Sequence, residues 1–280
     1  MQHIHTSPRG LGYRVFDMRE PWTKQGGARG ATPIVFQHGL GLNGLAWLPW
    51  ISRLSPDRQM IAIDMRGHGA SKAMWSRPSL DVGDYANDVL DVLNVLEIDR
   101  CHFVGESFGG TAGLYLGIHA PDRIASITVA STGWRGDLVN NIGGWPEVLA
   151  KPGGIEAWGD MLTEGSFDPA LIDPGLIAWA SALHVEAMPE AVAAVVLSLR
   201  SADLGPDLHR LTMPILNIVA GRSPFVDAAQ HPILAERAAS CTQLDFPQAK
   251  HRVFLTEAEA CAQALQSRLT DSIQRWRQAD

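Results

Sequence analysis

The chain has 280 residues, of which 46% are hydrophobic and 19% are charged. This balance is typical of a packed globular protein and excludes a disordered chain. A formal net charge of −7 argues against a basic face for duplex nucleic acid, so we expect no nucleic-acid partner. No stretch approaches the roughly 18 uninterrupted apolar residues that a membrane span needs, so we also expect no membrane association.

The start of the chain and its cysteines favour a cytoplasmic protein. The first five residues are not a basic segment that leads into an apolar run, as a secretory signal peptide would be. Cys101, Cys241 and Cys261 are too few and too scattered for a disulfide framework or a zinc site. We therefore expect free thiols and no metal. The oligomeric state is open, a homodimer included.

Compact apolar runs recur along the chain and predict the strands of a buried sheet. They cover residues 33–37, 60–64, 101–105, 124–130 and 214–220, and further strands are predicted at 11–16 and 242–246. Apolar side chains at helical spacing predict a helix over 85–96, and glycines predict a turn at 25–30. Strands that alternate with helices predict an α/β fold with a mostly parallel central sheet and helices on both faces.

One long segment breaks this alternation. Residues 134–208 have a helical pattern, are interrupted by glycine and proline, and are rich in tryptophan. We predict that they form a helical lid inserted between two core strands. The core domain would then consist of residues 1–133 and 209–280.

The strongest chemical signal is Gly105-Glu106-Ser107-Phe108-Gly109, which directly follows a predicted strand and opens a predicted helix. It fits the G-x-S-x-G pattern of a nucleophile elbow. A serine in such a tight turn has strained backbone dihedrals, and only glycines on either side leave room for the turn. Ser107 is therefore the predicted nucleophile.

A second glycine-rich turn, His38-Gly39-Leu40-Gly41, follows another buried strand. Such a turn can direct the backbone N–H of Leu40 toward an anionic oxygen, with the N–H of Phe108 as second donor. Each donor in an oxyanion hole contributes roughly 3–4 kcal/mol to transition-state stabilisation. We expect His38 itself to be structural.

His251 is the predicted general base. It follows the last predicted strand, 144 residues after Ser107, so the two can meet only through the fold. An unperturbed histidine titrates near pKa 6.5, which leaves a neutral imidazole available at pH 7. His68, between two glycines, instead predicts a loop packed by an Asp–Arg pair rather than a metal site.

These motifs, in this order along essentially the whole chain, resemble the α/β-hydrolase fold family. The segments Ser131-Thr132-Gly133-Trp134 and 199–204 around the lid are most similar to the 3-oxoadipate enol-lactonase-like branch. The resemblance implies hydrolysis of an ester or lactone through an acyl-enzyme.

The chain departs from the family at the triad acid. Family members place it after the strand matched by 215–220, but Ser223 and Pro224 stand there. Other members carry the acid one core strand earlier, where Ser131 and Thr132 stand. Asp227 is the nearest carboxylate in the usual loop and our candidate for orienting His251. Weaker alternatives are Asp245 and Asp137, and a Ser–His dyad assisted by water stays open.

The predicted function is hydrolysis of a small ester or lactone, with no cofactor. The tryptophans of the lid, with Trp47, Trp50 and Phe108, favour an apolar or cyclic substrate. Trp134 and Arg135 are candidate substrate-binding residues, since Arg135, or else Arg222, would pair with a substrate carboxylate.

Two other functions stay open. The same Ser–His apparatus in related enzymes cleaves carbon–carbon bonds of vinylogous diketones. The missing triad acid favours the second alternative, a ligand-binding receptor of the same fold that turns over its ligand poorly.

Overall fold

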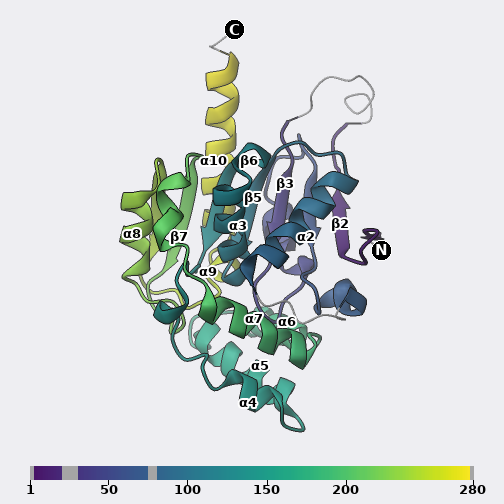
Figure 1. The fold of residues 1–280 in the computed structure, drawn as a ribbon, viewed down its shortest axis with the longest axis vertical. Helices are drawn as coiled ribbons and strands as arrows, with labels where there is room; N and C mark the ends of the chain where they lie inside the picture. The colour runs from purple at the N-terminus through teal and green to yellow at the C-terminus, as the bar shows by residue number, and fades with distance from the viewer. Residues whose placement is uncertain (1–2, 21–30, 75–80, 278–280) are drawn as a thin grey trace.

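The computed structural model describes residues 3–20, 31–74 and 81–277, so the turn predicted at 25–30 lies outside the described residues. The chain is built around one eight-stranded sheet (Figure 1). Its strands are β1 (Ile4–Thr6), β2 (Gly12–Phe16), β3 (Ile34–Gln37), β4 (Met60–Ile63), β5 (Cys101–Glu106), β6 (Ile124–Ala130), β7 (Ile215–Ala220) and β8 (Cys241–Phe246).

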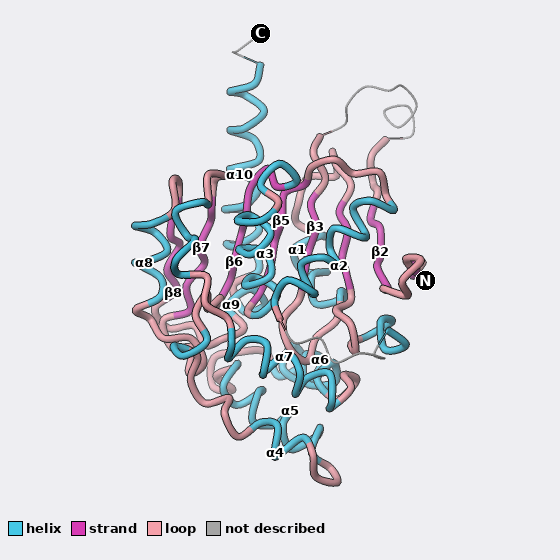
Figure 2. The backbone as a smooth tube through the Cα atoms, in the orientation of Figure 1, coloured by secondary structure: helices cyan, strands magenta, loops and turns pink. Residues whose placement is uncertain are grey.

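The strand order is β1-β2-β4-β3-β5-β6-β7-β8. The pairs β1–β2 and β2–β4 are antiparallel, and every other neighbouring pair is parallel. Figure 2 shows most of these strands side by side across the molecule. The predicted fold class, an α/β protein with a mostly parallel sheet, is confirmed.

The central strands form where the sequence is continuously apolar. Every residue of β3, β4, β5 and β7 is buried, because helices cover both faces of the sheet. No strand is predicted from the sequence at β1, whose three residues are all exposed. This short edge strand owes its conformation to backbone pairing with β2, which a local pattern does not record.

The helices form three groups. Their bounds are α1 (Leu48–Ile51), α2 (Val82–Val95), α3 (Phe108–His119), α4 (Trp145–Leu149), α5 (Gly154–Ser166), α6 (Pro174–His184), α7 (Pro189–Ser201), α8 (Gln230–Arg237), α9 (Val253–Thr256) and α10 (Ala258–Arg277). Side chains of α1, α9 and α10 pack on one face of the sheet, and those of α2, α3 and α8 on the other.

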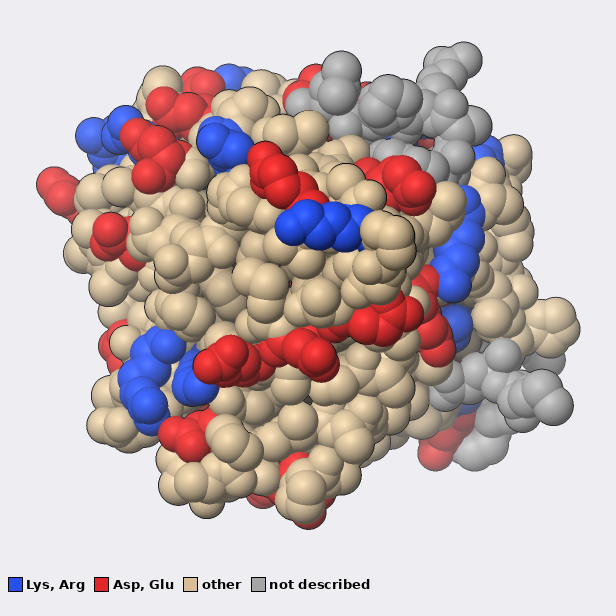
Figure 3. Space-filling view, turned by 90° about the horizontal axis from the view of Figure 1, so that it is seen from below, with Lys and Arg blue, Asp and Glu red and all other residues tan. Residues whose placement is uncertain are grey.

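The third group, α4 to α7, lies together at one end of the sheet (Figure 1). We call these four helices the lid segment; they fall within the predicted lid at 134–208. Seen from below, this end of the molecule carries acidic and basic side chains among mostly uncharged ones (Figure 3). Among the described helices none alone is long and apolar enough to cross a membrane; α6 and α7, bent by 94°, pass that test only as a pair.

The strand order brings two loops together. From β3 the chain continues to β4 on one side, whereas β5 pairs with the other side of β3, with Gln37 opposite Gly105. Such a switch point opens a crevice at the carboxyl ends of parallel strands. The loop after β3 therefore lies beside the loop after β5.

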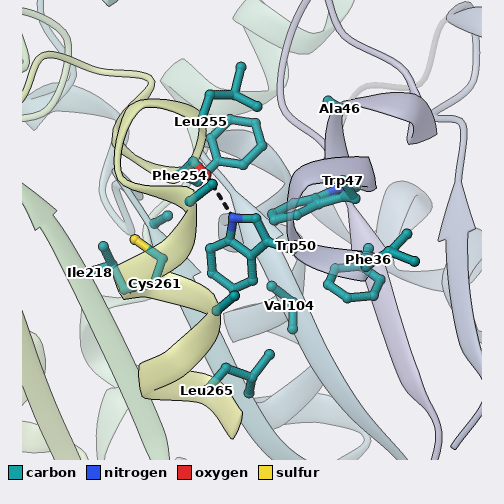
Figure 4. Packing of buried hydrophobic residues seen from close by; sticks show 14 of the residues in the cluster. Phe36, Ala46, Trp47, Trp50, Val104, Ile218, Phe254, Leu255, Cys261 and Leu265 are labelled. Carbon is teal, nitrogen blue, oxygen red and sulfur yellow. Dashed lines mark hydrogen bonds between the residues drawn. The ribbon is translucent and has the colours of Figure 1, made fainter. Parts of the chain in front are cut away.

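Trp50 anchors the core between α1 and α9. Its side chain is fully buried, and its indole Nε1–H donates to the carbonyl oxygen of Phe254 at 2.7 Å. Figure 4 shows Trp50 among Phe36, Trp47 and the α10 residue Cys261. This bond fixes α9, and with it the residues just before α9, against the sheet.

We expect Trp50→Phe to lower the free energy of unfolding by about 2–4 kcal/mol, because it leaves a cavity and a buried carbonyl without its donor. Urea unfolding followed by circular dichroism measures this loss. The half-buried Trp179 provides a matched control, since Trp179→Phe should cost less than about 1 kcal/mol. Equal losses in the two variants would contradict the anchoring role.

Candidate active site

Ser107 occupies a strained turn between β5 and α3. Its φ of 51° and ψ of −123° lie outside the ordinary regions for a residue with a side chain. A Cβ at Gly105 would lie 2.6 Å from the backbone of Gly109, and a Cβ at Gly109 would lie 2.4 Å from the carbonyl oxygen of Gln37. The two glycines of the motif are thus needed for the turn, as the sequence predicts.

His251 reaches Ser107 from the loop after β8. Its Nε2 lies 3.1 Å from the Ser107 Oγ, a hydrogen-bond distance. The backbone carbonyl of His251 accepts a bond of 2.6 Å from the hydroxyl of Ser131, and the ring packs edge-on against Phe225. These contacts hold the imidazole in place from two sides.

Ser223 contacts the other ring nitrogen of His251. Its Oγ lies 2.9 Å from the His251 Nδ1. Ser223 follows β7, and its backbone N–H donates to the carbonyl of Ala220 at the end of that strand. A hydroxyl both donates and accepts, so the Ser223 Oγ can accept a hydrogen bond from Nδ1–H, which leaves the unprotonated Nε2 free to take a proton from Ser107.

Burial lowers the pKa of His251 well below its ordinary value of 6.5, and the positive charge of Arg252 lowers it further. The imidazole is therefore neutral at pH 7, the form that a general base requires. Among the described residues, Glu106 has the one carboxylate that would pair with this ring if the ring were protonated. Its Oε1 lies 3.6 Å from Nε2, not from Nδ1.

Glu106 and Arg252 form a buried ion pair beneath the site. The Arg252 Nη1 donates to the Glu106 Oε2 at 2.7 Å, and both side chains are almost fully buried. The same oxygen accepts the backbone N–H of Gly39 at 3.0 Å, and the Arg252 Nη2 donates to the carbonyl of Leu40 at 2.7 Å. The pair thus ties the loop after β3 to the residues that flank Ser107 and His251.

A cavity of about 20 Å³ opens above Ser107 and His251, room for about one water. Its wall is mostly apolar and is contributed by the core and by the lid segment. It consists of Leu40, Ser107, Thr111, Gly133, Val139, Ile142, Trp145, Leu162, Val196, Leu199, Phe225, Val226, His251 and Arg252.

Comparisons with known proteins agree with the fold that carries this site. The α/β hydrolase fold family is matched over residues 32–152. The chain superposes on the enol-lactonase from Burkholderia xenovorans LB400 with a TM-score of 0.81 and 25% identity, covering 96% of this chain and 100% of that one. The chain has the α/β-hydrolase fold.

Two curated relatives are similar in sequence. A 3-oxoadipate enol-lactonase of Acinetobacter baylyi is 27% identical over 84% of this chain and 87% of its own length. The dihydrolipoyllysine-residue acetyltransferase component of the acetoin cleaving system of Pseudomonas putida is 27% identical over 87% of this chain, which spans 65% of that protein. The family resemblance expected from the sequence, enol-lactonases included, is confirmed.

The prediction that Asp227 orients His251 is corrected by the structure of this α/β-hydrolase-fold protein. The Asp227 carboxylate accepts the backbone N–H of Ala229 before α8, a local capping bond. Asp137 pairs with Arg135, and Asp245 accepts a bond from Gln243. The Nδ1 position is filled instead by Ser223, at the place in the sequence where the family carries its acid.

Trp134 and Arg135 are not brought to the cavity. The Trp134 indole donates to the carbonyl of Gln230, and its ring is buried in the hydrophobic core. Arg135 is exposed and pairs with Asp137. Arg222, the other proposed partner of a substrate carboxylate, pairs with Asp168. Trp145 is the lid tryptophan that does line the cavity.

Leu40 and Phe108 lie where the sequence places the oxyanion donors. Leu40 lines the cavity beside Ser107, and Phe108 begins α3 directly after it. Within the described part of the chain, neither backbone N–H donates to a protein acceptor. Both remain available to a ligand, and their role as oxyanion donors remains a prediction.

The other histidines near the site are structural. The His38 Nε2 accepts the backbone N–H of Met65, and burial lowers the His38 pKa to about 3. The His68 Nε2 accepts the N–H of Gly41. The sequence predicts an Asp–Arg pair in this loop, but Asp64 and Arg66 do not pair with each other. Over residues 3–20, 31–74 and 81–277, no three His, Cys, Asp or Glu side chains are grouped as a metal ion would require.

The roles of Glu106, Arg252 and Ser223 are not predicted from the sequence. Glu106 is the variable residue of the elbow motif, and Arg252 directly follows His251. Two charged residues next to the two predicted catalytic positions are a signal that could have indicated the ion pair.

We expect Asp227→Asn to leave kcat within about twofold of the wild-type value, because its carboxylate caps the start of α8 and Ser223 stands at the His251 Nδ1 instead. Steady-state hydrolysis of an aryl ester measures this. A loss of about tenfold or more, the effect expected of a residue that orients the base, would contradict the placement.

Proposed function

We propose that this protein hydrolyses a carboxylic ester or lactone, with Ser107 as nucleophile and His251 as general base. The observation that carries the proposal is the 3.1 Å contact between the Ser107 Oγ and the His251 Nε2, at a strained turn that opens into an apolar cavity. The enol-lactonase relatives, whose names state lactone hydrolysis, support it.

In the first half-reaction the Ser107 Oγ attacks the substrate carbonyl carbon while His251 takes the hydroxyl proton at Nε2. The resulting oxyanion accepts hydrogen bonds from the N–H groups of Leu40 and Phe108. The C–O bond then breaks, and the proton on His251 passes to the leaving alkoxide. In the second half-reaction water, deprotonated by His251, releases the acid and restores Ser107.

The wall of the cavity favours an uncharged acyl group. Its side chains are mainly aliphatic and aromatic, and its one permanent cation, Arg252, is already paired with Glu106. A substrate carboxylate would lack a free cationic partner on this wall. We therefore propose a neutral ester or lactone with an apolar acyl chain, a small-molecule partner as the sequence predicts.

Substrate binding requires movement of the lid segment. The cavity has room for about one water, and Trp145, Leu162, Val196 and Leu199 close it from the lid side. Displacement of these side chains would make room for an acyl chain without moving Ser107 or His251.

The test is covalent labelling with a fluorophosphonate, read by intact-protein mass spectrometry, alongside hydrolysis of 4-nitrophenyl butyrate. We expect one label per chain and turnover in the wild type, and neither in Ser107→Ala, because the nucleophilic oxygen is gone. The exposed Ser201 supplies the control, since Ser201→Ala should retain both.

Other outcomes identify the alternatives. A wild-type protein that is neither labelled nor active would exclude the hydrolase proposal and favour a binding function. Labelling of Ser107 with turnover of a dienoic diketone, but not of esters, would indicate carbon–carbon bond hydrolysis instead.

A further inference from the structure

The proposed mechanism places a positive charge in a buried site. When His251 takes the proton of Ser107, the ring becomes an imidazolium that is almost completely shielded from water. Burial and the neighbouring Arg252 both disfavour that charge. In a Ser-His-Asp triad the carboxylate on Nδ1 stabilises the imidazolium, but here Nδ1 faces the uncharged hydroxyl of Ser223.

We propose that Glu106 supplies the missing negative charge from the opposite side of the ring, as a positioning residue that acts on His251. The two tasks of the triad acid would then be divided: Ser223 orients the imidazole, and Glu106 stabilises its charge. This inference rests on the proposed function.

The geometry of Glu106 fits this task. Its Oε1 lies 3.6 Å from the His251 Nε2, the atom that receives the proton. Oε1 is buried and has no hydrogen-bond partner among the described residues, whereas Oε2 accepts bonds from Arg252 and Gly39. One oxygen therefore holds the side chain in place, and the other is left facing the ring. A buried carboxylate oxygen without a hydrogen-bond partner is costly, so its position beside the ring calls for an explanation.

Arg252 opposes protonation of Glu106. Burial raises the pKa of Glu106, and the guanidinium at 2.7 Å and the Gly39 N–H offset part of that rise. Because a guanidinium does not lose its proton in proteins, its positive charge always favours the carboxylate form of Glu106. Four polar or charged side chains then face the ring: the hydroxyls of Ser107 and Ser223, the carboxylate of Glu106 and the guanidinium of Arg252.

No proton moves to Glu106 in this scheme. The proton of Ser107 forms a bond to the His251 Nε2, and the positive charge develops on the ring within reach of the Glu106 Oε1. When the leaving alkoxide takes that proton, the ring is neutral again and Glu106 is unchanged.

The test compares Glu106→Gln with the double variant Glu106→Gln/Ser223→Asp, using 4-nitrophenyl butyrate over a range of pH. Gln keeps the shape of the side chain but removes its charge. We expect kcat to fall at least tenfold, and the acid limb of kcat/KM to shift to lower pH, because the imidazolium loses its counter-charge and the His251 pKa falls. Ser223→Asp restores a carboxylate at Nδ1, so the double variant should recover at least threefold in kcat and its acid limb should return to higher pH.

A matched control separates charge from stability. Asp88, whose carboxylate accepts a bond of 2.6 Å from the buried Arg66, forms a comparable ion pair away from Ser107. Asp88→Asn should lower the melting temperature without moving the acid limb. If circular dichroism shows that Glu106→Gln does not fold, Glu106→Asp takes its place. The shorter Asp side chain keeps the negative charge but holds it farther from the His251 Nε2. The acid limb of kcat/KM in this variant should therefore also move to lower pH.

The results that overturn the inference differ from those that overturn the function. An unmoved acid limb in Glu106→Gln or its substitute, or a rate loss that Ser223→Asp does not restore, would show that Glu106 only braces the loop after β3. Ser107-dependent turnover by the wild type would then leave the proposed hydrolase function intact. Absence of turnover in the wild type would remove both.

Discussion

The contact between Ser107 and His251 is the constraint on which the rest of the site depends. It exists because β5 ends in a turn that only Gly105 and Gly109 permit, so that the serine hydroxyl is raised above the sheet edge. The imidazole arrives from a loop 144 residues later, which parallel strands place at the same edge. A strained backbone of this kind costs about 1–3 kcal/mol and persists only where the surrounding structure enforces it.

The site differs from a Ser-His-Asp triad in where its negative charge lies. Ser223 stands at Nδ1, and the acid nearest to the ring is Glu106, which adjoins the nucleophile. The buried pair of Glu106 and Arg252 also contacts Gly39 and Leu40, which belong to the loop expected to bind the oxyanion. One ion pair therefore links the nucleophile, the base and the oxyanion loop, and a change to either partner would affect all three.

The sequence predicted what local patterns encode. Buried strands, the elbow at Ser107 and the late His251 follow from apolar runs and glycine spacing, and the structure places them as expected. The prediction that Asp227 orients His251 is wrong, because proximity along the chain does not determine which way a loop directs its side chains. Trp134 is predicted as a substrate-binding residue but packs in the core, because a sequence does not distinguish burial in a core from burial in a cavity. Glu106 and Arg252 gain their roles only when the chain folds.

The roles of Ser107 and His251 are tested most directly by a crystal structure of the protein after reaction with a fluorophosphonate. This reagent forms a tetrahedral adduct that resembles the acyl-transfer intermediate. We expect a bond from phosphorus to the Ser107 Oγ, with one phosphoryl oxygen about 3 Å from the N–H groups of Leu40 and Phe108. The His251 Nδ1 should still contact Ser223. An adduct on another residue, or an adduct at Ser107 with the imidazole turned away and the oxygen directed elsewhere, would contradict it.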